Sequence, residues 1–184
     1  YSRNGLFFDN NGNTKMNYIT YKNNNLKIGN NSFILSFMVK FISNVITGGH
    51  ITKHASIFAI YYKSGTYGGI KGFEFVVIQG SNQLRFYNGV TYYTTGISIP
   101  HDKWCKITIR NNLENINNLK NMNVSIQTDD SITEENFNHT FHFGEIDYII
   151  FGGIINSGSL NQDIRTEIYS LKNVYLSDIN YYIG

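Results

Sequence analysis

Apolar and polar residues alternate along much of this chain with a period of two, which is the repeat of a β-strand. The clearest run covers residues 33–41. Its apolar residues Phe33, Leu35, Phe37, Val39 and Phe41 occupy every second position, and Ser36 and Lys40 lie on the other face. A strand with this pattern turns one face toward a core. Residues 33–41 are therefore predicted to be a core-covering strand.

Similar short runs follow one another along the whole chain, separated by clusters of glycine, asparagine and serine. Roughly a dozen such runs in succession favour a β-sandwich or barrel over parallel α/β units. The runs between residues 57 and 94 are expected to form a meander, with Asn88-Gly89 as a hairpin turn. Residues 131–136 fit one capped helical turn, and residues 111–121 fit an exposed loop. The other predicted strands are residues 5–9, 16–21, 57–62, 73–79, 83–87, 90–94, 104–110, 123–128, 139–143, 148–152 and 167–176.

Length and composition place the chain among globular domains. Its 184 residues, 41% hydrophobic and 15% aromatic, are enough for one domain over residues 1–184 with a core that needs no disulfide or metal. The single cysteine, Cys105, excludes an internal disulfide and a cysteine-based zinc site. Because Cys105 stands in a predicted strand, it is expected to be a small buried side chain rather than a nucleophile.

The charges exclude some partners. The 15 Lys and Arg residues are balanced by 13 Asp and Glu residues and form no basic stripe, so nucleic acid is not an expected partner. No apolar run is long enough to be a transmembrane segment. A chain that opens on Tyr-Ser-Arg without Met is expected to be a fragment of a larger secreted protein, with the other domains of that parent as neighbours.

Three blocks resemble a known superfamily. They are residues 32–41 (SFILSFMVKF), 101–110 (HDKWCKITIR) and 167–178 (EIYSLKNVYLSD). Together they look like the concanavalin A-like lectin and laminin-G-like jelly roll. This resemblance implies an all-β fold in which two antiparallel sheets form a sandwich and the Trp104 strand is central.

Two branches of that superfamily are similar to parts of the chain. Residues 144–158 (GEIDYIIFGGIINSG) resemble the lectin modules attached to bacterial sialidases. Residues 104–113 (WCKITIRNNL), with the richness in Asn, Ile and Tyr, are similar to the jelly-roll half of clostridial neurotoxin receptor-binding regions. Either resemblance implies an extracellular binding module. No single ligand-binding residue of the sialidase modules aligns with this chain, so none is transferred.

Catalysis is not expected. Glu145 and Asp147 begin a pattern like the Glu-x-Asp-x-x-Glu strand of laminarinase-type glycosidases, but Ile150 replaces the last carboxylate. A retaining glycosidase needs both carboxylates, so the chain is predicted not to be an enzyme. His139 and His142 would lie on opposite faces of a strand, and no cofactor is expected. Asp9, Asn11 and Asn13 have the oxygen spacing of a calcium loop without its terminal bidentate acid, which makes calcium only a weak candidate.

Glycan binding requires little more than aromatic faces and a few polar groups, and residues 73–93 supply both. If Phe73, Phe75, Val77, Leu84 and Phe86 point inward, Glu74, Arg85 and Tyr87 share the opposite face with Tyr92 or Tyr93. Arginine suits the carboxylate of a sialic acid because its planar fork binds two oxygens at once. The alternative is that Arg85 and Glu74 are an exposed cross-strand ion pair.

Two further candidates are Arg165, just before the last predicted strand, and Tyr67, in a glycine-rich segment that fits a binding loop. The predicted function is a non-catalytic carbohydrate-binding module for sialylated or other anionic glycans, with a cell-surface glycan or glycoprotein as partner. The alternative is a structural or protein-docking jelly-roll domain of a bacterial toxin or surface protein.

Overall fold

The structure is a computed structural model that describes residues 5–8, 19–22, 33–42, 54–62, 70–78, 81–87, 91–112, 120–139, 146–152 and 174–183. These residues form strands, turns and irregular segments, and none of them is helical. Within these ranges there is accordingly no helix of the length and apolar character needed to cross a membrane. The all-β prediction is confirmed.

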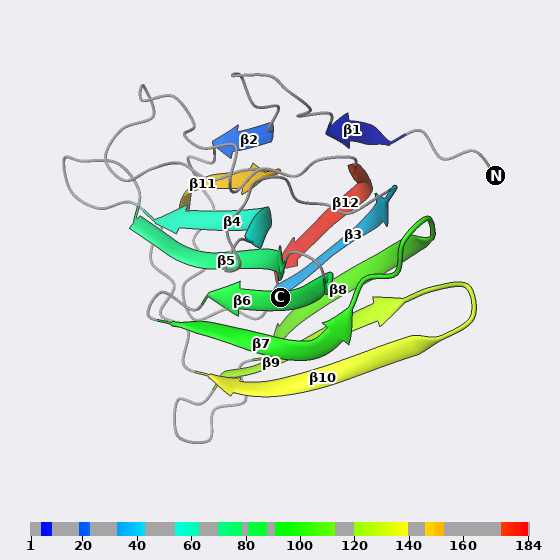
Figure 1. Cartoon of the computed structure of the whole chain (residues 1–184). Helices are drawn as coiled ribbons and strands as arrows, with labels where there is room; N and C mark the ends of the chain where they lie inside the picture. Colours follow the sequence, from blue (N-terminus) through cyan, green and yellow to red (C-terminus); the bar gives the residue numbers. More distant parts are fainter. Residues whose placement is uncertain are drawn as a thin grey trace.

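The described residues form twelve strands arranged in two antiparallel sheets of six (Figure 1). The sheet order β1-β12-β3-β8-β9-β10 defines what we name the β3 sheet. The order β2-β11-β4-β5-β6-β7 defines the β5 sheet. The strands are β1 (Leu6–Phe8), β2 (Ile19–Lys22), β3 (Phe33–Phe41), β4 (His54–Tyr62), β5 (Ile70–Ile78), β6 (Gln83–Tyr87), β7 (Tyr92–Ser98), β8 (Trp104–Asn112), β9 (Lys120–Gln127), β10 (Ile132–His139), β11 (Ile146–Phe151) and β12 (Val174–Ile183).

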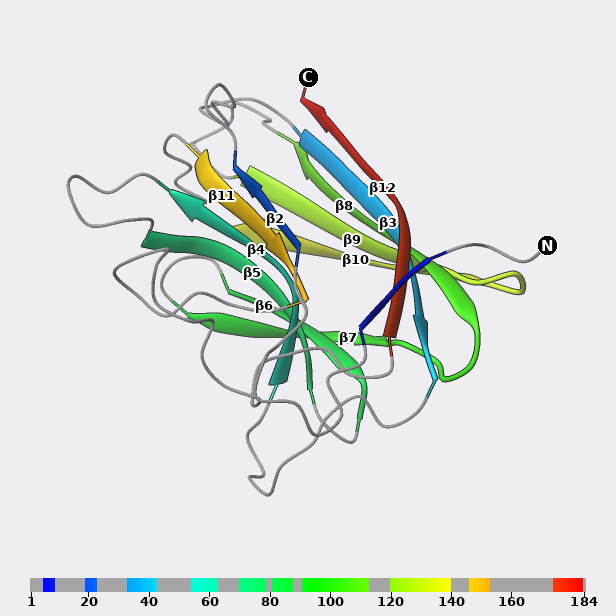
Figure 2. The same cartoon turned by 90° about the horizontal axis from the view of Figure 1, so that it is seen from above.

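The connections follow the jelly-roll expectation. Strands β4 to β7 are consecutive neighbours and form the predicted meander. Strand β8, which begins at Trp104, lies between β3 and β9 in the middle of its sheet. Viewed from above, the two sheets form the two layers of a sandwich (Figure 2).

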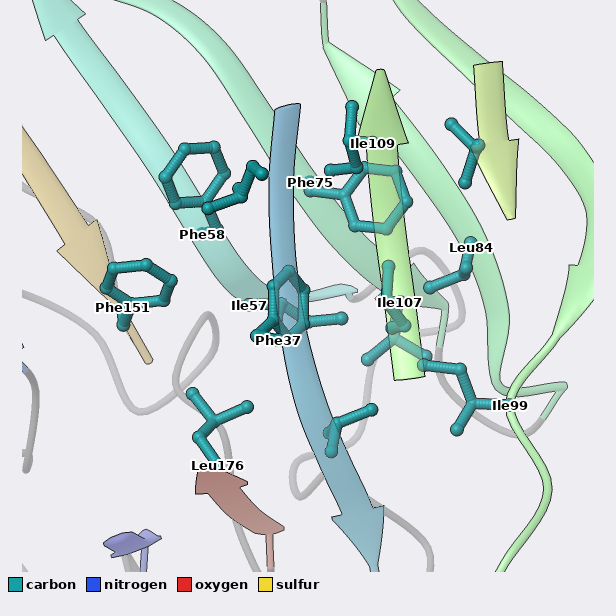
Figure 3. Packing of buried hydrophobic residues seen from close by; sticks show 14 of the residues in the cluster. Phe37, Ile57, Phe58, Phe75, Leu84, Ile99, Ile107, Ile109, Phe151 and Leu176 are labelled. Carbon is teal, nitrogen blue, oxygen red and sulfur yellow. The ribbon is translucent and has the colours of Figure 1, made fainter. Parts of the chain in front are cut away.

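The core fills the space between the sheets. The five alternating apolar side chains of β3 are 0–2% exposed, as their period predicts. They meet Phe58, Phe75, Leu84 and Phe86 of the β5 sheet in one buried cluster. Figure 3 shows Phe37 of β3 together with Phe58, Phe75 and Leu84. The Phe151 ring joins the layers, with its centroid 5.2 Å from that of Phe58 and 6.4 Å from that of Phe37. Burial of these large side chains is the main force that holds the sheets together.

The first strand closes one side of the core. Phe8 is 2% exposed and lies against Gly152, which follows β11. Gly152 has a φ of +84°, and a Cβ atom there would overlap the Phe8 ring. A glycine is needed at this position for both reasons.

At the opposite side, β7 of one sheet approaches β10 of the other. The Gly96 amide donates a hydrogen bond of 2.6 Å to Glu135 Oε2. Nearby, the Phe86 and Phe137 rings meet edge to face with centroids 4.9 Å apart. These two contacts join the sheets along this side, and we name them the β7–β10 clasp.

The expectation of a helical turn at residues 131–136 is wrong. Strand β10 pairs with β9 in continuous register from Ile132↔Gln127 to His139↔Lys120. The apparent cap belongs to the tight turn between these strands, where the Thr128 hydroxyl accepts the Ser131 amide at 3.1 Å. A hydroxyl that satisfies a nearby amide is as typical of a turn as of a helix start.

Other boundaries also differ from the predictions. Strand β8 runs to Asn112 and β9 starts at Lys120, so both ends of the predicted loop at 111–121 belong to strands. Strand β4 begins at His54, three residues before the predicted start at residue 57. Of the predicted strand at 139–143, only His139 is described. Of the one at 167–176, only residues 174–176 are described, and they begin β12.

Candidate functional site

The outer face of the β5 sheet carries the residues that the sequence grouped together. Backbone pairing aligns Glu74 with Tyr87, and Tyr87 with Tyr92. One step along the strands, Arg85 pairs with Val76 and with Thr94. Because alternate residues share a face, Glu74, Arg85, Tyr87 and Tyr92 lie together on the side away from the core.

Exposure on this face increases from the middle of the sheet toward β7. The outer side chains of β11, β4 and β5 are covered: Ile150, Ala59, Tyr61, Ser56, Glu74 and Val76 are 0–3% exposed. Arg85, Tyr87 and Tyr92 are half-buried, and Thr94 is exposed. The alternative of an exposed Glu74–Arg85 ion pair is therefore wrong, because the Glu74 carboxylate is fully buried. The open part of the face lies over β6 and β7.

Tyr92 connects the members of this group. Its hydroxyl donates a hydrogen bond of 2.8 Å to the buried Glu74 Oε2. The Arg85 Cζ lies 5.1 Å from the centroid of the Tyr92 ring, a cation–π distance. The Tyr87 ring lies beside the Tyr92 ring, with centroids 4.9 Å apart. A buried carboxylate thus positions a tyrosine, and the face of that tyrosine supports the guanidinium.

The guanidinium retains capacity to bind. Arginine has five N–H donors and no acceptor. The Arg85 Nε atom is buried and has no hydrogen-bond partner among the described residues, so a ligand would have to pair with the terminal N–H groups of this half-buried side chain. An arginine held by stacking, with donors to spare, matches the planar oxygens of a carboxylate or sulfate.

Tyr93 belongs to the other face. It packs on the core and stacks on Phe86, with ring centroids 5.2 Å apart and planes at 20°. The alternation in residues 83–87 predicted the directions of Arg85 and Tyr87. It could not choose between Tyr92 and Tyr93, because the choice depends on the register of β7 against β6.

Most of the other residues that the sequence analysis considered for a binding, catalytic or metal site are not described by the structure. Arg165, Tyr67, Asp9, Asn11, Asn13, Glu145 and His142 lie outside the described residues. Asp147 and His139 are placed only as backbone in β11 and β10, and Ile150 is buried. Within the described ranges, no three His, Cys, Asp or Glu residues are grouped to hold a metal ion.

Cys105 is the buried small residue that the sequence predicted, at 0% exposed within the core cluster. Its burial raises the pKa of the thiol to about 11; nearby Asp129 adds to the increase and Lys103 partly offsets it. A protonated, inaccessible thiol is a poor nucleophile.

The fold belongs to the concanavalin A-like jelly rolls, the class that the sequence resembles. Among solved structures it is similar to the LG1-3 region of the laminin α2 chain, with a TM-score of 0.57 and 18% identity over 95% of this chain and 30% of that one. It is also similar to the binding domain of botulinum neurotoxin serotype G, with a TM-score of 0.52 and 15% identity over 96% of this chain and 41% of that one. The serotype D binding domain gives a TM-score of 0.51 and 12% identity, covering 92% and 37%.

No family model and no curated protein matches the chain. The chain spans less than half the length of each of these three solved structures. At these identities the likeness concerns the fold, and function has to be argued from the site.

Proposed function

We propose that this chain is a non-catalytic binding module for an anionic glycan, such as a sialylated one, presented at a cell surface by a glycan or glycoprotein. Its place of action in this proposal is extracellular. The carrying observation is the Arg85 guanidinium, which lies over Tyr92 while the Tyr92 hydroxyl is anchored on buried Glu74.

The three roles follow from chemistry. Arg85 pairs with the carboxylate of the sugar through charge-assisted hydrogen bonds. Tyr87, half-buried beside Tyr92, offers an aromatic face to sugar C–H groups. Glu74 does not touch the ligand, since it is fully buried; it positions Tyr92. This preorganisation reduces the entropy lost when the ligand binds.

The test is binding of the Arg85→Ala variant to an array of sialylated, sulfated and neutral glycans. Loss of a charge-assisted contact costs about 1.5–3 kcal/mol, so affinity for the sialylated ligand should fall about ten- to a hundredfold. Arg85→Lys keeps the charge but not the fork and should recover only part of the affinity.

Lys103→Ala is the control for charge alone. Lys103 forms an exposed ion pair of 3.1 Å with Asp130, away from the site. The Lys103→Ala variant should therefore bind the glycan like the wild type. Unchanged binding by Arg85→Ala at an unchanged melting temperature would contradict the proposal. So would a wild-type protein that ignores every anionic glycan.

A further inference from the structure

The outer face of the β3 sheet, on the opposite side of the sandwich, carries a line of small hydroxyl side chains at its centre. Backbone pairing aligns Ser36 with Thr108, and Thr108 with Ser125, in a line across β3, β8 and β9. All three point away from the core, yet they are only 7–8% exposed. We name them the hydroxyl row.

The hydroxyl row is recessed because its neighbours are longer. On one side, Arg110 aligns with Ile34 and Asn123; on the other, Lys106 aligns with Met38 and Gln127. Arg110, Lys106 and Gln127 are exposed. Within the part of the chain that the structure describes, none of the three recessed hydroxyls has a side-chain hydrogen bond. Each hydroxyl has donor and acceptor capacity for a ligand lying along the row.

Charge on this face is positive at its centre. Lys106 and Arg110 stand two residues to either side of Thr108 on β8, so their Cα atoms are about 13 Å apart along the strand. Lys40 adds a third cation on the adjacent β3. The described carboxylates of the face lie on the flanking strands. Glu134 of β10 pairs in register with Ser125, at one end of the hydroxyl row, and Asp178 lies in the bulge of β12. An anionic group of a ligand is therefore favoured over β3 and β8, which carry the three cations, and disfavoured beside Glu134 and Asp178.

Aromatic rings lie at one end of the same face. Lys40 pairs in register with both Tyr175 and Trp104. The Tyr175 ring lies 6.2 Å from the Trp104 ring and 4.5 Å from the Phe7 ring, measured between centroids. Phe7 is 41% exposed, and the other two rings are half-buried. Such rings are suited to pack against the C–H surface of a sugar.

We propose that the outer face of the β3 sheet is a second binding site, for an extended anionic polysaccharide. Its carboxylate or sulfate groups pair with Lys106 and Arg110, and its hydroxyl groups bond the hydroxyl row. Three cations are too few for a nucleic acid, whose affinity comes from neutralising many phosphates. The polar hydroxyl row does not suit insertion into a lipid surface, which requires an apolar face that the membrane can bury. This site uses none of the residues of the β5 face.

The experiment measures binding of equal-length oligosaccharides of hyaluronan, chondroitin sulfate and neutral dextran by titration calorimetry. The key variant is Thr108→Val, which removes one hydroxyl without changing shape, charge or strand preference. It should weaken binding of the charged oligosaccharides about threefold to tenfold, and Arg110→Gln about tenfold. The Lys103→Gln variant removes a positive charge that is already paired with Asp130, and it should bind normally.

Three outcomes would overturn the inference. The first is that neither charged oligosaccharide binds, and the second is that the Thr108→Val variant binds them like the wild type. The third is that phosphatidylserine vesicles bind through Lys106 and Arg110 while the oligosaccharides do not bind. Arg85→Ala separates this site from the proposed function. It should leave polysaccharide binding intact here, and Thr108→Val should leave the sialylated-glycan signal intact.

Discussion

Gly152 is the residue at which backbone and packing constraints coincide most clearly. It needs a positive φ, and its missing side chain makes room for the Phe8 ring. Gly152→Ala should therefore destabilise the protein by about 2–5 kcal/mol, from left-handed backbone strain and overpacking together. Chemical denaturation monitored by tryptophan fluorescence measures this.

Gly96→Ala is the matched control. An added Cβ atom there would lie 3.4 Å from Glu135 Oε2, which is close to ordinary contact, and no positive φ is involved. Its effect should stay within about 0.5 kcal/mol. Equal losses in the two variants would show that Gly152 is not specially constrained.

The buried thiol of Cys105 has a consequence for reactivity and for stability at alkaline pH. With a pKa near 11 in place of 9.0, the folded protein holds about a hundredfold less thiolate at pH 8. Maleimide labelling should then be slow in buffer and fast in denaturant. Fast labelling of the folded protein would show that the thiol is accessible.

The sign of the linked pH effect follows from the same pKa. Between pH 9 and 11 the unfolded chain loses this proton and the folded chain keeps it, so Cys105 favours folding below pH 9 and this contribution is lost as pH rises toward 11. Cys105→Ala should reduce the slope of stability against pH over this interval.

At the scale of the elements, the β7–β10 clasp is the contact most open to a direct test. Glu135→Ala removes the acceptor for the Gly96 amide and should cost about 1 kcal/mol, with faster hydrogen exchange at Gly96. Glu135→Gln keeps an acceptor and should cost less. Glu134→Ala removes the same charge from the exposed outer side of β10 and should change stability by less than about 0.5 kcal/mol.

Period-two alternation was sufficient to predict the meander and the inward side chains of β3, because it records which face is buried. The capping pattern, by contrast, was misleading at residues 131–136, because a serine followed by acidic residues looks alike in a turn and at a helix start. Alternation was silent on the hydroxyl row. Ser36, Thr108 and Ser125 are far apart in the chain, and only the pairing of three strands places them side by side.

At the scale of the whole molecule, the two sheets enclose one core and each has an outer face. Alternation predicts which side chains point to an outer face, but not whether they are exposed there. The prediction that Glu74 points away from the core is confirmed by its pairing, but its complete burial could not be read from β5 alone. Burial on an outer face depends on what covers it, and that depends on segments distant in the chain. The same reasoning explains why the resemblance specified the fold better than the site.

The edge strands of the two sheets are alike in how they are protected. On one side their last described strands, β1 and β2, are only three and four residues long. On the other side the longer β7 and β10 are tied to each other by the clasp, and β10 bears acidic side chains at 134 and 135. Long free strand edges invite another chain to add itself and start an aggregate, and short, charged or occupied edges discourage it. Among the described strands, these edges should therefore limit the edge-to-edge addition of a second copy of the chain.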